Sequence, residues 1–131
     1  MNYVTNFASA GSSMGMSSGD APDSICPRGW ILATYDGNKS YKNLIIDVYG
    51  RENANPNRDT GILYLPLSFL RSGNYNYSNG NKDNRGSDGY YWESRIASAT
   101  YSNYLYFNSA RLGPQNGTSR GHGFSVRCLS H

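Results

Sequence analysis

The stretch GYYWESRIASATYSNYLYFNSARLGPQNGTSRGHGFSVRCLSH, residues 89–131, decides the fold of this chain. Aromatic and apolar residues alternate there with small polar ones, most clearly over residues 104–107 and 124–127. An alternation of period two is typical of strands that bury one face. We therefore expect strands at residues 90–97, 101–108 and 123–130. The residues expected to form their scaffold are Tyr104, Tyr106, Phe124, Val126 and Cys128.

The sequence before residue 89 predicts one short helix and long loops. Residues 41–49 carry apolar side chains at helical spacing, after Ser40, which can cap a helix, and before Gly50, which can end one. Residues 30–34 predict a further strand. Small polar residues predict loops at residues 8–23, 51–60 and 73–88. The expected fold class is α+β, with one or two short helices, a small antiparallel sheet and long loops.

The composition is polar but weakly charged. The chain has 131 residues, enough for one domain with a core, and holds 12 Tyr and 15 Gly. Only 16% of its residues are charged, the net charge is +3, and the cationic side chains are scattered. A nucleic-acid-binding protein needs a dense basic stripe, so we expect no nucleic-acid partner. A neutral, Tyr-rich surface suits a secreted binding protein.

Two cysteines, Cys26 and Cys128, stand too far apart for a CxxC metal or redox motif. They can form a long-range disulfide or remain two buried thiols, and the extracellular character of the composition favours the disulfide. The opening residues MNYVTNFASAGSSMG lack the basic and apolar regions of a signal peptide. No transmembrane segment is visible either, so we expect any export signal to lie outside this sequence.

Several blocks of the sequence resemble one known family. The blocks are CPRGW (26–30), LPLSFLRSG (65–73), GYYWES (89–94), NYLYFNS (103–109) and GFSVRC (123–128). Together they resemble the Fibrobacter-type major paralogous domain of bacterial surface and secreted proteins, over roughly residues 20–131. That family is similar to C-type-lectin-like folds and to variable proteins that diversity-generating retroelements diversify.

The resemblance implies a C-type-lectin-like, ligand-binding domain at residues 24–131, with residues 1–23 as a linker or extension. It also implies that Cys26 and Cys128 are joined, and that the ligand face lies between GYYW and GFSVRC. Retroelements diversify positions encoded by Asn-type codons, and the polar positions here hold a matching set of residues. We expect these to form one contiguous ligand-binding surface: Glu93, Arg95, Tyr101, Asn103, Asn108, Arg111, Gln115, Asn116, Thr118, Ser119 and His122.

The large aromatic residues need a separate assignment. We expect both tryptophans, Trp30 and Trp92, in the core. Four tyrosines should divide between the core and the surface face according to strand parity, because successive side chains of a strand point to opposite sides. These are Tyr90, Tyr91, Tyr104 and Tyr106.

The sequence gives little indication of metal binding or catalysis. His122 and His131 have no partner at ligand spacing, and the clustered carboxylates of a calcium site are missing, apart from a faint calcium-loop pattern at residues 81–88. No GxSxG nucleophile motif is present. Formylglycine-generating enzymes share the broad fold, but their paired catalytic cysteines are not available here. We therefore expect no metal, no cofactor and no enzymatic activity.

Three functions remain in view. The first is an adhesin-like or receptor-like module that recognises a protein or glycan on another cell or surface. The second, kept as the alternative, is a structural subunit of a bacterial surface layer or appendage. The third is an enzyme of the formylglycine-generating type. The polar recognition face favours the first, with an extracellular or cell-surface location and no direct membrane insertion.

Overall fold

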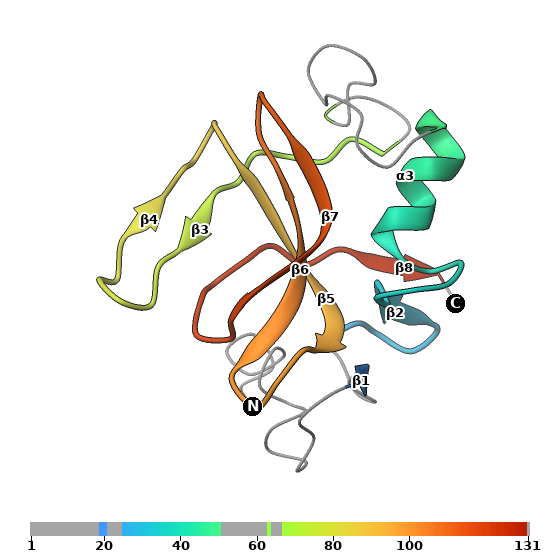
Figure 1. Cartoon of the computed structure of the whole chain (residues 1–131), viewed down its shortest axis with the longest axis horizontal. Coiled ribbons are helices and arrows are strands. Elements are labelled where there is room, and N and C mark those ends of the chain that lie inside the picture. The colour runs from blue at the N-terminus through green and yellow to red at the C-terminus, as the bar shows by residue number, and fades with distance from the viewer. Residues whose placement is uncertain (1–18, 21–24, 51–62, 64–66, 131) are drawn as a thin grey trace.

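The computed structural model describes residues 19–20, 25–50, 63 and 67–130. These residues form an α+β structure with small antiparallel sheets, which confirms the expected fold class (Figure 1). The elements, in chain order, are β1 (Gly19–Asp20), β2 (Trp30–Leu32), α3 (Tyr41–Tyr49), β3 (Asn74–Tyr75), β4 (Lys82–Asp83), β5 (Gly89–Ile96), β6 (Tyr101–Phe107), β7 (Leu112–Ser119) and β8 (Cys128–Ser130). Among the described helices, none has both the length and the apolar character needed to cross a membrane.

The helix forms where the sequence predicts it. The Ser40 hydroxyl accepts a hydrogen bond from the Asn43 backbone N–H at 3.1 Å, which satisfies one of the free donors at the helix start. Gly50 ends the helix with a left-handed backbone, φ 79°, and its N–H donates to the Ile46 carbonyl. A residue with a side chain adopts this conformation at a cost, so glycine suits the position.

The largest sheet has four antiparallel strands in the order β1–β5–β6–β7. The predictions of strands at 90–97 and 101–108 are confirmed within one residue at each end. The third predicted strand, at 123–130, is shorter than expected, because only Cys128–Ser130 forms a strand. Residues 123–127 instead make two isolated bridges, from Gly123 to Tyr75 and from Ser125 to Tyr91.

Strand β7 is absent from the sequence prediction because its residues, LGPQNGTS, are those of a turn. It lies at the edge of the sheet, where the missing N–H of Pro114 breaks no ladder. Its register also shifts between the pairs Tyr104–Asn116 and Tyr106–Gly113. This bulge takes up the irregular residues while the ends of the strand stay paired.

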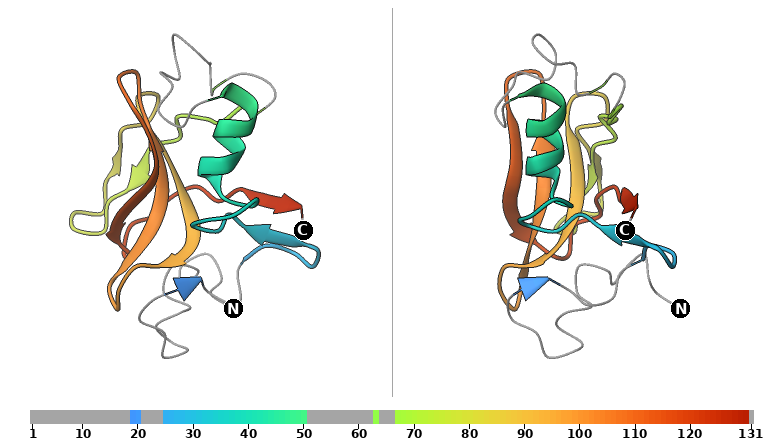
Figure 2. Two further views of the ribbon diagram at one scale, coloured as in Figure 1. Left: turned by 45° about the vertical axis from the view of Figure 1, so that its right-hand side comes forward. Right: turned by 90° about the vertical axis from the view of Figure 1, so that its right-hand side faces the viewer.

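The sheet has two different faces (Figure 2). Tyr91, Leu105 and Phe107 point towards α3 and enclose the main core with Tyr41, Ile45, Phe69 and Leu112. The alternate residues Tyr90, Tyr104 and Tyr106 point the other way, which confirms the predicted division of the tyrosines by parity. The face opposite the helix is partly covered by residues 120–127 and by the β3–β4 hairpin (Figure 1).

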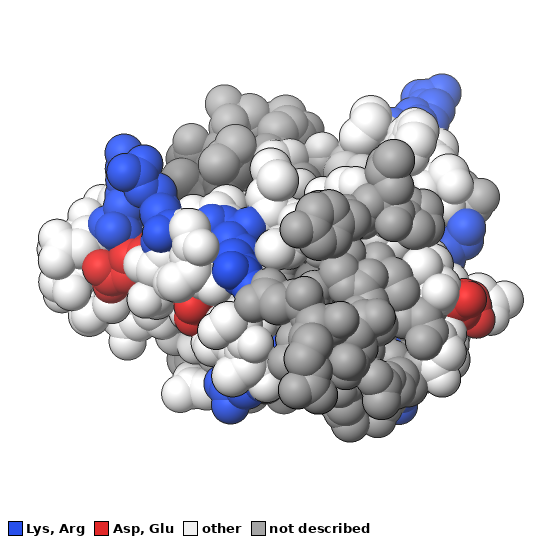
Figure 3. Space-filling model, turned by 90° about the horizontal axis from the view of Figure 1, so that it is seen from above, with Lys and Arg blue, Asp and Glu red and all other residues white. Residues whose placement is uncertain are grey.

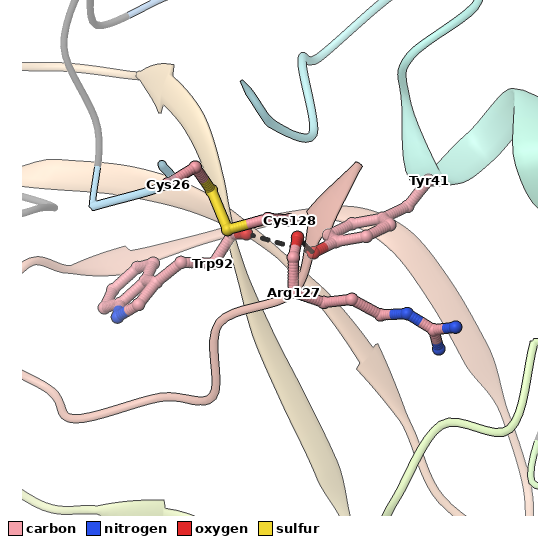
Figure 4. The surroundings of a disulfide bond; sticks show 5 residues. All are labelled: Cys26, Tyr41, Trp92, Arg127 and Cys128. Atoms are coloured by element: carbon pink, nitrogen blue, oxygen red, sulfur yellow. Dashed lines mark hydrogen bonds between the residues drawn. A yellow bond between two sulfur atoms is a disulfide. The ribbon is translucent and has the colours of Figure 1, made fainter. Parts of the chain in front are cut away.

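The strand that follows Cys26 pairs with the last described strand. β2 and β8 form a two-stranded antiparallel sheet, with Leu32 opposite Cys128. A disulfide joins Cys26 to Cys128, as the resemblance implies (Figure 4). The expected strand at 30–34 is confirmed in part, over Trp30–Leu32. The core assignment is right for Trp92 but wrong for Trp30, whose side chain is 49% exposed.

Two predicted loops contain strands. Residues 73–88 include the hairpin β3–β4, which the sequence does not signal because Asn, Gly and Ser dominate it. Within the predicted linker 8–23, Gly19 and Asp20 pair with Ile96 and Arg95 of β5. The remaining linker residues and the predicted loop at 51–60 lie outside the described residues, as does His131.

Candidate functional site: an aromatic face with a polar rim

Five aromatic side chains cover the side of the sheet that faces away from α3. We call this set, Tyr90, Trp92, Tyr104, Tyr106 and Phe124, the aromatic face. Trp92 and Tyr106 are buried within it, and the other three side chains are half-buried. The Trp92 and Phe124 rings stack at 4.3 Å, and Phe124 lies 4.9 Å from both Tyr90 and Tyr104. Tyr90 also stacks on Tyr104 at 5.9 Å. Paired rings at these distances hold one another in place, so the face is rigid.

The tyrosine hydroxyls of this face converge on one carboxylate. Tyr106 donates to Asp88 Oδ2 at 2.7 Å, and Tyr90 donates to the same oxygen at 3.3 Å. Asn84 donates to the Tyr90 hydroxyl at 3.1 Å, and Asn108 to the Tyr106 hydroxyl at 2.7 Å. Each of these two hydroxyls therefore both donates and accepts. The face thus presents polar groups whose positions are fixed before any ligand arrives.

The environment holds these tyrosines in the neutral, donating form. Burial, reinforced by the negative charge of Asp88, raises the pKa of Tyr90 well above its ordinary value. Burial also raises the pKa of Tyr106, again with a contribution from the hydrogen bond to Asp88. Burial alone raises the pKa of Tyr104, and the nearby Arg111 partly opposes it. All three are hydrogen-bond donors at neutral pH.

A cation stands at the rim of the face. The Arg111 guanidinium lies over the Tyr106 ring, 4.6 Å from its centroid, and its side chain is exposed. The turn between β6 and β7 fixes the residue, because Asn108 Oδ1 accepts from the backbone N–H groups of Ala110 and Arg111. Arg111 therefore combines an anchored backbone with a charged group that a ligand can reach.

Five of the eleven predicted ligand residues belong to this face or its rim. Asn108 and Arg111 contact Tyr106, as described above. The His122 ring stacks on Phe124 at 5.6 Å and meets the edge of Tyr77 at 4.9 Å. Two more residues are directly paired with residues of this side of the sheet: Asn116 is opposite Tyr104, and Thr118 is opposite Ser102.

The other six predicted residues lie elsewhere. Glu93 is 1% exposed, on the side of β5 that carries Tyr91, so the expectation that it is a surface residue is wrong. Asn103 is 8% exposed, and its amide donates to the Asn116 carbonyl. Tyr101 and Ser119 are paired with each other and share the Asn103 side of the sheet.

Arg95 and Gln115 meet at a different place, the loop after β2. The Arg95 guanidinium lies over the Tyr35 ring at 4.9 Å. Gln115 donates to the Tyr35 carbonyl at 2.6 Å and to Asp36 Oδ1 at 3.4 Å. The two residues secure this loop against the sheet. The eleven residues are therefore divided between the two sides of the sheet and do not share one side.

None of the five residues of the aromatic face is among the eleven expected ligand residues: Tyr104, Tyr106 and Phe124 are expected in the scaffold, Trp92 in the core, and Tyr90 on whichever side strand parity places it. A usable signal was present, because residues 104–107 alternate Tyr-Leu-Tyr-Phe and so place both hydroxyl-bearing rings on one side. Asp88 and Asn84 had no such signal, since they lie in a loop whose path the sequence does not reveal. The side chains described here can bind, orient and exclude water. In the part of the chain that the structure describes, no three His, Cys, Asp or Glu residues group as a metal site would require.

Comparison with known proteins adds no relative. No family model matches the chain, and neither a curated protein nor a solved structure is significantly similar to it. Its function must therefore be argued from the residues and their arrangement.

Proposed function

We propose that this chain is a ligand-binding domain, not an enzyme, displayed outside the cell and recognising a protein or glycan through the aromatic face. The observation that carries the proposal is the pair of half-buried tyrosines, Tyr90 and Tyr104, with the exposed Arg111 at the rim over the buried Tyr106 ring. Tyr and Arg are the residues that most often dominate binding energy, because they give large contact areas and directed hydrogen bonds.

The structure that carries the aromatic face also supports a ligand-binding function. The face lies on a sheet whose other side is filled by the main core, and a disulfide closes the domain. Such a frame lets the polar rim vary without unfolding the domain, since the rim residues are not part of the core. Disulfides are typical of oxidising compartments, which agrees with an extracellular or cell-surface location.

The resemblance to the Fibrobacter-type major paralogous domain gives the finer proposal. On it, the domain has a C-type-lectin-like fold, and the rim residues Asn108, Arg111, Asn116, Thr118 and His122 are the positions that a retroelement diversifies. The genomic test is direct. A reverse-transcriptase gene beside the coding sequence, with a near-copy of its 3′ segment, supports diversification, and their absence removes it.

Binding is tested with two probe sets, a printed glycan array and a displayed peptide library. The variant Tyr104→Ala/Arg111→Ala removes one ring and the rim cation from the face. The matched control is Tyr101→Ala, whose exposed side chain lies on the other side of the sheet. We expect a ligand in at least one set, with about tenfold or greater loss in the double variant and none in the control, which corresponds to about 1.4 kcal/mol.

Three results would overturn the proposal. The first is the absence of binding in both probe sets, and the second is binding that survives the double variant. The third is concentration-dependent self-assembly that Tyr104→Ala/Arg111→Ala abolishes. That result would show that the aromatic face joins copies of this chain, as the alternative function of a structural subunit requires.

A further inference from the structure

A hollow lies beside the aromatic face, and none of the eleven residues expected to bind ligand lines it. It is a groove of about 210 Å³ between the β3–β4 hairpin and residues 123–125. The lining residues that matter for its chemistry are Ser72, Tyr75, Lys82, Arg85, Phe124 and Ser125. Sites for drug-sized molecules have about 300–1,000 Å³, so this groove suits a single small ring.

The groove is formed before any ligand binds. Tyr75 and Gly123 exchange two backbone hydrogen bonds, of 2.8 and 2.9 Å, which fix the hairpin to the C-terminal segment. A side chain at Gly123 would lie 2.8 Å from Tyr75 Cβ, so only glycine allows this close approach. On the other wall, the hydroxyls of Ser72 and Ser125 are 2.5 Å apart. Both walls are therefore held by contacts within the protein.

The charged side chains that line the groove are all cationic. Lys82 and Arg85 line it, and no carboxylate does. Neither cation has an ion pair among the described residues. The nearest acids in sequence have other partners, since Asp83 accepts from Asn76 at 3.2 Å and Asp88 accepts from Tyr106 and Tyr90. Figure 3 shows Lys and Arg side chains on the side of the molecule where β3 and β4 lie, with Asp or Glu side chains beside them. Two unpaired cations beside a small hollow attract an anion.

The remaining lining indicates what kind of anion. Tyr75 is 48% exposed and Phe124 is half-buried, so both present ring surface against which the C–H groups of a sugar can pack. The two serine hydroxyls can donate to and accept from sugar hydroxyls. A bare phosphate or carboxylate would use the cations but leave the rings uncovered. We propose that this groove binds one acidic monosaccharide, such as a uronic acid at the end of a glycan.

This site is independent of the proposed ligand at the aromatic face, although Phe124 borders both. The probe is glucuronic acid, and its binding is measured from the shifts of backbone amide signals in NMR spectra. Two controls accompany it: glucose is the neutral sugar, and a short poly-glutamate peptide is the acid that is not a sugar. We expect saturable shifts at residues 72–75, 82–85 and 123–125, with a millimolar Kd typical of a single small ring. Glucose and the peptide should bind at least tenfold more weakly.

The variant Lys82→Gln/Arg85→Gln removes both cations and should weaken glucuronic acid binding at least tenfold. The matched control is Arg28→Gln/Lys39→Gln, which lowers the net charge equally at residues near β2 and α3. Equal loss in both variants would show an effect of net charge and overturn the site. Equal binding of glucose would overturn acid recognition, and equal binding of the peptide would overturn sugar recognition. The variant Arg111→Ala changes the rim of the aromatic face at a residue that contacts Tyr106 and does not line the groove, so it should keep glucuronic acid binding. Failure here and failure of the proposed function are therefore distinguishable.

Discussion

The hydroxyl of Tyr41 donates a hydrogen bond to the backbone carbonyl of Arg127 at 3.2 Å, across 86 positions of sequence. The same hydroxyl lies 3.5 Å from the Trp92 carbonyl (Figure 4). Tyr41 begins α3, Trp92 belongs to β5, and Arg127 precedes the disulfide-bonded Cys128. One fully buried side chain thus connects the helix, the sheet and the C-terminal strand.

We predict that Tyr41→Phe lowers the free energy of unfolding by about 1–2 kcal/mol, because the buried carbonyls lose their donor while the ring still fills the core. Urea unfolding followed by circular dichroism measures the loss. Tyr101→Phe is the control, since its exposed hydroxyl should matter by less than about 0.5 kcal/mol. If the two variants unfold at the same urea concentration, the hydroxyl of Tyr41 does not contribute as described.

The same residue predicts how stability depends on alkaline pH. Burial, with a contribution from Glu93, raises the pKa of Tyr41 in the folded state far above the 10.0 of an ordinary tyrosine. The unfolded chain therefore releases this proton first, and the free energy of unfolding falls as the pH rises above about 10. Below about pH 10 both the folded and the unfolded state keep this proton, so the free energy of unfolding does not change with the titration of Tyr41. In Tyr41→Phe the decline should be shallower by about 1.4 kcal/mol per pH unit, and equal slopes in a urea series would contradict this assignment.

The disulfide should contribute strongly because it closes a long loop. The cysteines are 102 positions apart, and the chain-entropy relation gives about 4–5 kcal/mol for such a loop. We expect Cys26→Ser/Cys128→Ser to lose an amount of this order in urea unfolding under non-reducing conditions. Thiol alkylation of the native wild-type protein checks the bridge itself, and two freely alkylated cysteines would disprove it.

Two glycines of the sheet should respond very differently to alanine. A Cβ at Gly89 would lie 2.1 Å from the Phe107 ring, which is fully buried and cannot move aside. We expect Gly89→Ala to destabilise the protein by about 3 kcal/mol, at the upper end of overpacking effects. A Cβ at Gly117 meets nothing nearer than 3.8 Å, so Gly117→Ala should be within about 0.5 kcal/mol of the wild type in thermal unfolding. The reverse order would mean that Gly89 is not packed as described.

Local patterns predicted the regular elements well. Ser40 and Gly50 mark the helix ends because capping is a local interaction, and alternation located β5 and β6 because one face of each is apolar. The pairing of β7 could not be predicted, since Gly113, Pro114 and Gly117 favour turns and only the sheet edge and a bulge accommodate them.

The candidate site was predicted only in part, because the type of a residue does not reveal the direction in which its side chain points. Residue type suggested which side chains could bind, but strand parity and register decide which of them point the same way. Parity with the core residue Tyr91 indicates that Glu93 is buried, and the register places Tyr101 and Ser119 away from Asn116 and Thr118. The groove depends on the bridge between Tyr75 and Gly123, whose 48-residue separation no local pattern reveals.

The disulfide has a mechanical consequence. Tension applied to the chain before Cys26 and after Cys128 passes through the covalent bridge, because the bridge is the shortest path between the two points. The 102-residue span between them would otherwise extend to about 350 Å when pulled straight. Every residue of the aromatic face and of the groove lies within that span. Both surfaces therefore keep their shape under a load that would unravel an unbridged domain.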